Sequence, residues 1–416
     1  MKVLMLHNYH RTGSASGDDQ VFDNEAELLQ EHGVRVIKYS VSNDEYDKAG
    51  VFGKIAITMG MLWSFKHSNA VKTIIKNETP DIVHVHTFFP LLSPSVLYAA
   101  KRNGCKVVAT LHDARFICPC ATSLRGNTIC NLCGDGKYFR MCRYRCFKDS
   151  LPMSFVVACI FRYHRWRKSF YNQIDRYICL NDTQVDLLTG IGFSKDKLIK
   201  KYNFTRDMKK NISELPGDSK KGITLEQDLD NREREVPDRY VIFFGRIGKE
   251  KGADLLMKMW DKIDDIPLVI IGGGPLEEEI KEWAARREHV YYLGYRRHDE
   301  CLSIVQKAEY VVFPSIWYEG CSMVEVESEM MGKPIIASDI GFSHELINDG
   351  VNGYLVPLGD LEGFVRRIKE MWNDKETIER MSAAARKDYE NRFERENNYR
   401  QLKCIYDALI SSKQSI

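Results

Sequence analysis

Two carboxylates, Glu319 and Glu327, lie eight residues apart in the stretch SIWYEGCSMVEVESEM. Glu319 stands beside a glycine, directly after the apolar run YVVFPS, which is typical of a β-strand. Glu327 lies in a segment that is predicted to be helical. The spacing therefore predicts one carboxylate at the mouth of a strand–helix turn and a second one deeper in the helix.

The helix is predicted to start at Ser322, because Glu325 follows three residues later in the pattern of a capping box. N–H groups of the first turn, around Met323 and Val324, would suit phosphate oxygens. A capped helix with a negative first turn explains Glu325 without any ligand. It does not explain Glu319, which precedes the cap.

Cations accompany a second strand end, where the run YVIFFG is followed by GRIGKEKG. Arg246 and Lys251 on this glycine-flanked loop would suit a diphosphate, although a solvated loop is an equally good interpretation of this motif alone. A third run, LVIIGGG, leads into Pro275, which fits the first position of a helix. A structural turn explains this third motif without a ligand.

Half of the twelve cysteines fall between Cys118 and Cys146. Cys130 and Cys133 form a C-x-x-C pair, and further cysteines flank it on both sides. In a reducing compartment such a cluster indicates a closed, structural zinc site before it indicates disulfides. The alternative is a loop with six unligated thiols.

The chain has 416 residues, of which 44% are hydrophobic and 28% charged, so we expect a folded protein of two or three domains. A net charge of +2 does not favour a nucleic-acid partner. The start MKVLMLHNYH is too short an apolar run for a signal peptide, and no stretch is long enough to span a bilayer. We therefore expect a cytoplasmic location.

Short β-branched runs alternate with helical patterns in both halves of the sequence, which predicts βαβ units and parallel sheets covered on both faces. The fold class is therefore α/β, with two doubly wound domains and a ligand in the cleft between them. The first-half strands are predicted at 2–6, 34–40, 81–86, 106–112 and 175–180, and the second-half strands at 240–245, 268–274, 290–294, 310–315 and 334–338.

We expect an N-terminal domain at 1–204, with the cysteine-rich insertion at 118–146, and a C-terminal donor domain at 239–394. The polar segment 205–238 is interpreted as the connection, and a helix at about 395–416 is expected to pack back on the first domain. An Asp-X-Asp at Asp228–Asp230 lies in this connection and is not interpreted as a metal site.

The pieces GRIGKEKG, IIGGGP, PSIWYEGCSMVEVESEMMGKPIIASDIG and DGVNGYLV resemble family 4 of the retaining glycosyltransferases. The resemblance covers nearly the whole chain and implies the GT-B architecture of two Rossmann-like domains. It also implies transfer from a UDP- or GDP-linked sugar without a catalytic metal. The negative charge that builds on the diphosphate would then be stabilised by fixed cations and helix N–H groups.

The resemblance assigns roles by position. Glu319 is implied to contact the hydroxyls of the donor sugar, Glu327 the nucleotide ribose, and Arg246 and Lys251 the diphosphate. Ser322 stands where many members have glycine, but its backbone N–H is retained. Further donor contacts are implied for Gly17, Gly273, Gly274, Pro275, Gly320, Cys321, Ser322, Met323 and Val324.

The first half fits the family less closely. GSASGDDQVF stands where members have a Gly-Gly turn, and Gly17 is the residue that matches clearly. His112, at the end of the strand-like run KVVATLH, matches a histidine that reaches an outer hydroxyl of the sugar. A branch of the family carries a four-cysteine insertion, whose matching positions are Cys118, Cys130, Cys133 and Cys146.

The segment SFVVACIFRYHRWRKSFYNQ, 154–173, begins apolar and becomes basic and aromatic. On a helix, Phe155, Cys159, Arg162 and Trp166 would share one face. Such a helix can lie at an anionic membrane surface, with Arg162, Arg165, Arg167 and Lys168 as its cations. The alternative is a core helix of the first domain with a solvated basic end.

The resemblance implies a metal-independent, retaining hexosyltransferase that acts on a glycan or a lipid-linked glycan in lipopolysaccharide or capsule biosynthesis. We expect it in the cytoplasm or peripheral to the inner face of the plasma membrane. An epimerase would lack the pair Glu319 and Glu327 in this setting, and a phosphorylase would need a pyridoxal-binding lysine. The other alternative is a zinc-stapled scaffold protein without turnover.

Overall fold

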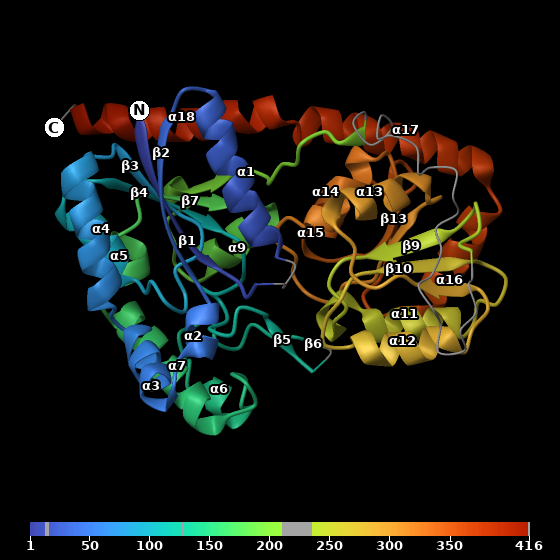
Figure 1. Cartoon of the computed structure of the whole chain (residues 1–416), viewed down its shortest axis with the longest axis horizontal. Coiled ribbons are helices and arrows are strands. Elements are labelled where there is room, and N and C mark those ends of the chain that lie inside the picture. Colours follow the sequence, from blue (N-terminus) through green and yellow to red (C-terminus); the bar gives the residue numbers. More distant parts are fainter. Residues whose placement is uncertain (13–15, 127, 210–234, 415–416) are drawn as a thin grey trace. The chain divides into compact units, whose positions relative to one another are not determined.

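The computed structural model describes residues 1–12, 16–126, 128–209 and 235–414. These residues form two compact units (Figure 1). The first unit comprises Met1–Arg125, Cys130–Asn203 and Arg395–Ile416, and the second comprises Gly126–Ile129 and Phe204–Glu394. Most of the predicted connection, including Asp228–Asp230, lies outside the described residues.

The first unit is built on a parallel sheet with the strand order β2-β1-β3-β4-β7-β8. The five strands predicted from the sequence are all present, and a short edge strand follows them. Their bounds are β1 (Lys2–Tyr9), β2 (Arg35–Ser42), β3 (Ile82–Val85), β4 (Lys106–Leu111), β7 (Arg176–Cys179) and β8 (Leu198–Lys200).

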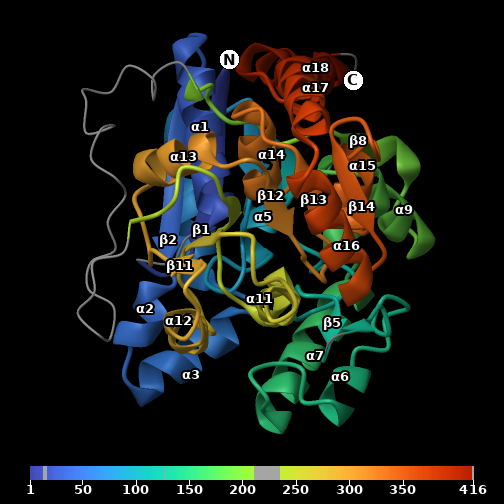
Figure 2. The same ribbon diagram turned by 90° about the vertical axis from the view of Figure 1, so that its right-hand side faces the viewer.

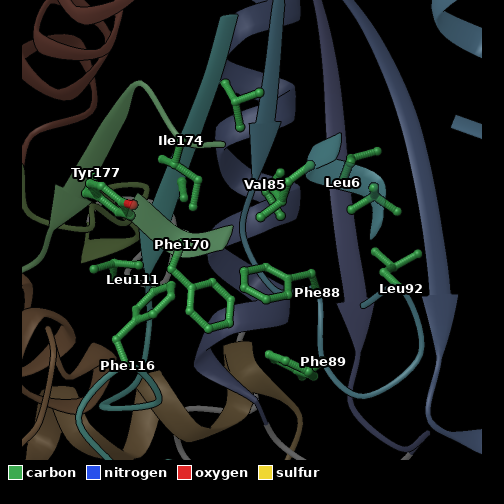
Figure 3. Packing of buried hydrophobic residues seen from close by; sticks show 14 of the residues in the cluster. Leu6, Val85, Phe88, Phe89, Leu92, Leu111, Phe116, Phe170, Ile174 and Tyr177 are labelled. Atoms are coloured by element: carbon green, nitrogen blue, oxygen red, sulfur yellow. The ribbon is translucent and has the colours of Figure 1, made fainter. Parts of the chain in front are cut away.

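Helices cover both faces of this sheet, which explains why β3 and β4 are almost entirely buried. Figure 3 shows the core under these helices, where Val85 and Leu111 on the strands pack with Phe88, Phe116 and Phe170 from the loops and helices. The helices are α1 (Gly17–Glu31), α2 (Asp44–Lys48), α3 (Val51–Gly60), α4 (Phe65–Glu78), α5 (Ser95–Arg102), α6 (Arg140–Arg143), α7 (Leu151–Trp166), α8 (Ser169–Asn172), α9 (Asp182–Gly190) and α18 (Arg395–Gln414).

The second unit has the strand order β11-β10-β9-β12-β13-β14, which is the order of a dinucleotide-binding sheet. Its bounds are β9 (Val241–Phe244), β10 (Leu268–Ile271), β11 (Val290–Tyr292), β12 (Val311–Phe313), β13 (Ile335–Ser338), β14 (Gly353–Val356), α11 (Ala253–Trp260), α12 (Glu277–Ala285), α13 (His298–Lys307), α14 (Met323–Met330), α15 (Gly341–Leu346), α16 (Leu361–Trp372) and α17 (Lys375–Arg392).

The expected place of Pro275 at the first helical position is wrong. The helix α12 begins at Glu277 with Leu276 as its N-cap, and the Leu276 N–H donates to the Ile247 carbonyl at 3.1 Å. The turn before α12 is therefore fixed by the preceding loop of β9, and Pro275 is an exposed residue within that turn.

The sheet topology singles out one edge of each unit. The strand order reverses direction between β9 and β12 in the second unit and between β1 and β3 in the first. In doubly wound sheets, ligands bind outside the carboxyl ends of the strands at such a reversal. The loops that follow β9 and β12 carry Arg246, Lys251 and Glu319, so the reversal brings together residues that are far apart in the sequence.

The last helix, α18, belongs to the first unit (Figure 1). Buried polar contacts attach it: Asn398 Oδ1 lies 2.8 Å from Lys201 Nζ, and the Tyr406 hydroxyl lies 2.7 Å from His84 Nδ1. Lys201 in turn pairs with Glu25 at 3.2 Å. Because all of these side chains are buried, removing α18 would leave a buried ion pair and a histidine without their partners.

Candidate active site

Lys251 and Glu319 form a close ion pair in the second unit, with Lys251 Nζ 2.5 Å from Glu319 Oε1. The Ser315 hydroxyl donates to the same oxygen at 2.9 Å. Only 6% of the Glu319 side chain and 17% of the Lys251 side chain are exposed, so the pair is held in one geometry. The pair thus joins the loop after β9 to the loop after β12.

The backbone brings these two loops together. Gly252 has a φ of +74°, and a Cβ at this position would lie 2.0 Å from the Pro314 carbonyl oxygen. The Ile316 N–H donates to the carbonyl of Glu250 at 3.0 Å, and the Ser315 hydroxyl oxygen, whose proton is directed to Glu319, lies 3.1 Å from the same carbonyl. The glycine that ends GRIGKEKG is therefore required by the close approach of the loops, and this approach aligns Lys251 with Glu319.

Arg246 lies on the same loop, and nearly half of its side chain is exposed. Its Nε donates to Glu250 Oε1 at 3.0 Å. Lys251 Nζ lies 5.4 Å from the centre of the Trp317 ring, which the sequence did not single out. The loop after β9 therefore places two cations, the half-exposed Arg246 and the half-buried Lys251, near the point where the strand order reverses.

The helix α14 begins as predicted after Ser322, but the predicted capping box is wrong. The Ser322 side chain makes no capping hydrogen bond, and Glu325 is fully buried with neither oxygen in a well-aligned hydrogen bond within the described chain. The Glu325 carboxyl is thus buried and does not complete the reciprocal pair of hydrogen bonds that defines a capping box. Ser322 therefore does not occupy the N–H groups of Met323, Val324 and Glu325.

Burial is also the main reason why the pKa of Glu325 is raised, to about 8. The negative charge of Glu319 raises this pKa further, whereas the hydroxyls of Ser343 and Ser322 and the charge of Lys251 lower it in part. Glu325 is therefore a neutral acid at pH 7, next to the charged pair.

Glu327 contacts a residue that the sequence analysis missed. Its Oε1 lies 2.7 Å from His298 Nε2, and this hydrogen bond raises the pKa of His298. His298 opens α13, directly after the strand end VYYLGYRR, and that position is the signal that could have identified it. Glu327 is buried, while nearly half of the His298 side chain is exposed.

The remaining donor positions of the second unit lie on these loops. Gly320, Cys321, Ser322 and Met323 are buried between β12 and α14, and Val324 is half-buried in the first turn of the helix. Gly273 and Gly274 follow β10. The structure thus groups the positions of the second unit at the carboxyl ends of β9, β10 and β12.

In the first unit, His112 follows β4 and is buried beside a second histidine, with His86 Nδ1 3.0 Å from His112 Nε2. Gly17 is the first residue of α1, where the Ser16 hydroxyl caps the helix by accepting from the Asp19 N–H. Residues 13–15 of the Gly/Ser loop lie outside the described residues. Asp18 Oδ1 lies 3.7 Å from His112 Nδ1, so the start of α1 and the end of β4 approach each other.

The cysteines of the insertion separate into two groups. Electrostatic interactions link the first group, whereas Cys142 interacts with Cys159 on α7; the first group is Cys118, Cys120, Cys130, Cys133 and Cys146. The thiol of Cys120 and nearby backbone N–H groups donate to Cys118 and lower its pKa, which stabilises a thiolate. A stabilised thiolate beside three thiols fits zinc chemically.

The spacing of these thiols is wider than that of a formed metal site. Across the part of the chain that the structure describes, the set with ligand atoms all within 4.8 Å of one another is Glu25, His84 and His86, and no three cysteines meet this spacing. All twelve cysteines are free thiols.

Two family models match this chain: glycosyl transferases group 1 over residues 226–388, and glycosyltransferase family 4 over residues 17–150. The chain is 30% identical to the O-antigen chain mannosyltransferase C of Escherichia coli over 182 residues, which are 43% of this chain and 49% of that relative. It is 26% identical to an uncharacterized glycosyltransferase of Methanocaldococcus jannaschii, over 81% of this chain and 78% of that one. The first alignment therefore spans about half of the relative's length.

The whole fold resembles a solved structure. An Anabaena protein, HepE, in complex with UDP matches with a TM-score of 0.65 at 16% identity, over 98% of this chain and 100% of the other. At this identity the match establishes the architecture, which is the two Rossmann-like domains of the GT-B fold. The predicted fold class is therefore confirmed.

Proposed function

This chain belongs to glycosyltransferase family 4, and on this premise we propose that it transfers a sugar, with retention of configuration, from a nucleotide-diphosphate sugar to a glycan or lipid-linked glycan acceptor. The observation that carries the proposal is the buried pair of Lys251 and Glu319 at the strand-order reversal, with Arg246 on the same loop. The O-antigen relative supports a role in the biosynthesis of a surface polysaccharide.

The proposed roles follow from charge and exposure. Arg246 and Lys251 would neutralise the diphosphate as it leaves, together with N–H groups of the first turn of α14. Glu319, held by Lys251 and Ser315, would accept hydrogen bonds from sugar hydroxyls. Glu327 would accept from the ribose. These groups supply the charge compensation of the reaction from the protein itself, so catalysis needs no metal.

Donor binding is the direct test of this proposal. A panel of UDP- and GDP-linked sugars should contain one that raises the thermal midpoint of the protein and gives sugar transfer or slow hydrolysis. Glu327→Gln should weaken nucleotide binding about tenfold, because it replaces a charge-assisted hydrogen bond to the ribose by a neutral one. Glu279→Gln, at an exposed position of α12, is the matched control.

A scaffold without turnover is the alternative. Such a protein would bind a nucleotide sugar but would release no nucleotide diphosphate with any acceptor. The measurement that separates the two is product formation from the stabilising donor, followed by chromatography of the nucleotide. Binding without product would favour the scaffold.

We also propose that Cys118, Cys130, Cys133 and Cys146 hold one structural zinc ion. Purified protein should then contain about one zinc per chain, and Cys133→Ser should abolish it and lower stability more than donor affinity. Cys142→Ser is the matched control, because Cys142 interacts with Cys159 and not with the four. Metal-free, fully folded protein in which all four thiols react with a thiol reagent would contradict the proposal.

A membrane surface is the proposed environment of the acceptor. Phe155, Cys159, Arg162 and Trp166 all lie on the exposed face of α7, with 54% of Phe155 and 70% of Trp166 accessible. Phe161 and Phe170 belong to the core instead, and Arg165 donates to the Gly134 carbonyl, so these three are not surface anchors. The helix thus combines both interpretations of its sequence, with one face in the core and one exposed.

Exposed apolar side chains also occur on α3, at the same end of the first unit. On α3, Phe52, Ile55 and Met59 are 88%, 56% and 64% exposed, and Figures 1 and 2 both show α3, α6 and α7 at the same end of the first unit. Nine lysines and arginines but one aspartate lie between Lys137 and Lys168. Within the described residues, no helix is both long and apolar enough to cross a bilayer. The proposed contact is therefore with the lipid headgroups.

Sedimentation with vesicles tests this contact. The protein should bind anionic vesicles at low salt and lose most of this binding at high salt, because exposed charges are screened. Replacing Arg162, Arg167 and Lys168 by Gln should weaken it by about 1 kcal/mol per cation. Replacing the exposed cations Lys281, Arg286 and Lys307 of the second unit should have little effect. Absence of binding at low salt would point to an acceptor in solution.

A further inference from the structure

A chain of buried side chains runs from the interior of the first unit to His112. Glu25 on α1 is 1% exposed, and its Oε1 lies 3.2 Å from His86 Nε2. His86 Nδ1 lies 3.0 Å from His112 Nε2, and the two ring planes are inclined by 22° with centroids 5.2 Å apart. A carboxylate and two imidazoles are therefore connected in series.

The metal-like spacing of Glu25, His84 and His86 has a different explanation. The positive charge beside Glu25 is already supplied by Lys201, whose Nζ lies 3.2 Å from Oε2. Both ring nitrogens of His84 have partners: Nδ1 lies 2.7 Å from the Tyr406 hydroxyl and 3.1 Å from Glu25 Oε1, and Nε2 lies 2.8 Å from the Thr110 hydroxyl. A divalent cation would have to displace these contacts and lie next to a buried ammonium group, which the charges disfavour.

His86 and His112 are both neutral, because burial lowers the pKa of His86 to about 3 and that of His112 well below its ordinary value. One proton must therefore lie in the gap between His86 Nδ1 and His112 Nε2, and two arrangements are possible. In the first, both rings carry their proton on Nε2. In the second, both carry it on Nδ1.

The charge of Glu25 favours the first arrangement. The second arrangement would place the bare Nε2 of His86 only 3.2 Å from a buried carboxylate oxygen, although neither of these two atoms is in a well-aligned hydrogen bond within the described residues. Asp18 favours it, but its oxygen is 3.7 Å from His112 Nδ1 and its side chain is 30% exposed. The nearer, fully buried carboxylate has the stronger effect, because solvent screens Asp18.

We infer that Glu25 and His86 are positioning residues which, through their contact with His112, hold its proton on Nε2 and leave its Nδ1 as a hydrogen-bond acceptor. His112 Nδ1 is buried and has no hydrogen-bond partner within the described residues. An acceptor at this place suits a hydroxyl group that donates its proton. The identity of this hydroxyl as one of a sugar rests on the proposed function, but the position of the proton does not.

Histidine side-chain NMR tests the inference without any turnover. Protein labelled with 15N in its histidine rings should show His112 protonated on Nε2, with its signals identified by their loss in His112→Ala. His86→Leu removes the acceptor of that proton and should shift His112 toward the Nδ1-protonated form. His86→Gln, whose amide can donate to Glu25 and accept from His112, should restore the Nε2 form. His32→Leu, at the other end of α1, is the control.

The carboxylate is tested by the pair of substitutions Glu25→Gln and Lys201→Met, made together so that neither charge is left buried alone. This variant should also lose the preference for the Nε2 form. Protonation of His112 on Nδ1 in the unaltered protein would overturn the inference, as would an unchanged tautomer in both His86→Leu and the Glu25/Lys201 variant.

Kinetics add a second measurement. We expect His86→Leu to lower kcat roughly tenfold to a hundredfold, as when an outer partner of an oriented imidazole is removed. In a His112→Ala background the same substitution should change kcat less than about twofold, because residues that act as a unit are not additive. A full effect in both backgrounds would assign His86 a structural role and overturn the inference. Failure of the proposed transfer would leave the NMR result intact.

Discussion

Lys251→Ala should lower turnover by roughly 10²–10³-fold, or about 2.7–4 kcal/mol, with the fold preserved. The side chain supplies positive charge where the diphosphate is proposed to leave, and this charge matters most in the transition state. The loss should therefore appear in kcat more than in the KM for the donor. The measurement is steady-state release of nucleotide diphosphate.

The structure offers a close control for this substitution. Lys249 lies two residues earlier in the same turn, but it is exposed and makes no ion pair within the described residues. Lys249→Ala should therefore stay within about twofold of the unaltered enzyme. Equal, small effects at both positions would mean that the diphosphate does not bind at this loop. Lys251→Arg tests whether charge alone suffices, since arginine keeps the charge but not the compact geometry.

The sheet strands were predictable because each is an apolar run between turns. All ten predicted strands occur, since burial on both faces produces a continuous hydrophobic pattern that needs no tertiary information. The edge strands β8 and β14 were not predicted. Each contains three or four residues with a charged or partly exposed member, so neither has a pattern that differs from a loop.

The functional positions were predictable in type but not in their partners. The sequence places Lys251 and Glu319 at strand ends, whereas their direct pairing depends on the reversal of strand order and on the contact of Gly252 with Pro314. The capping box failed for a related reason. Ser322 and Glu325 have the local pattern, but Glu325 is fully buried and no capping hydrogen bond forms.

The network around Glu25 could not have been predicted from any single segment. Its members come from α1, β3, the end of β8 and the last helix, which are far apart in the sequence. The sequence motifs identify His112 as a candidate but do not identify His86 or Glu25. Two signals could have identified Glu25 and His86. One is a glutamate in the apolar face of a helix, and the other is a pair of histidines, HVH, within a strand-like run.

Glu325→Gln should make the second unit more stable at high pH. The folded state raises the pKa of Glu325 to about 8 from an ordinary 4.5, so the folded protein holds this proton more tightly than the unfolded chain. Stability from this group is fully present below pH 4.5 and is lost as the pH rises to about 8. The slope is about 1.4 kcal/mol per pH unit for a complete difference of one proton.

The glutamine variant has the same shape as the neutral acid and does not titrate. It should match the unaltered protein near pH 5 and exceed its stability by about 2–4 kcal/mol near pH 8. Hydrogen exchange of the peptides that cover α14 reports on this unit alone, and Glu279→Gln on the exposed face of α12 is the control. Equal pH dependence in both proteins would mean that a cation or water compensates the Glu325 charge.

The same proton bears on donor binding. Ionised Glu325 would add a second negative charge beside Glu319, next to a site that we propose for a diphosphate. A neutral acid fills the space in the core without opposing the anion, so donor affinity should decline above about pH 8 in the unaltered protein and stay constant in Glu325→Gln. Titration of donor binding at pH 7 and pH 9 measures this difference. A decline of the same size in the glutamine variant would assign it to another group.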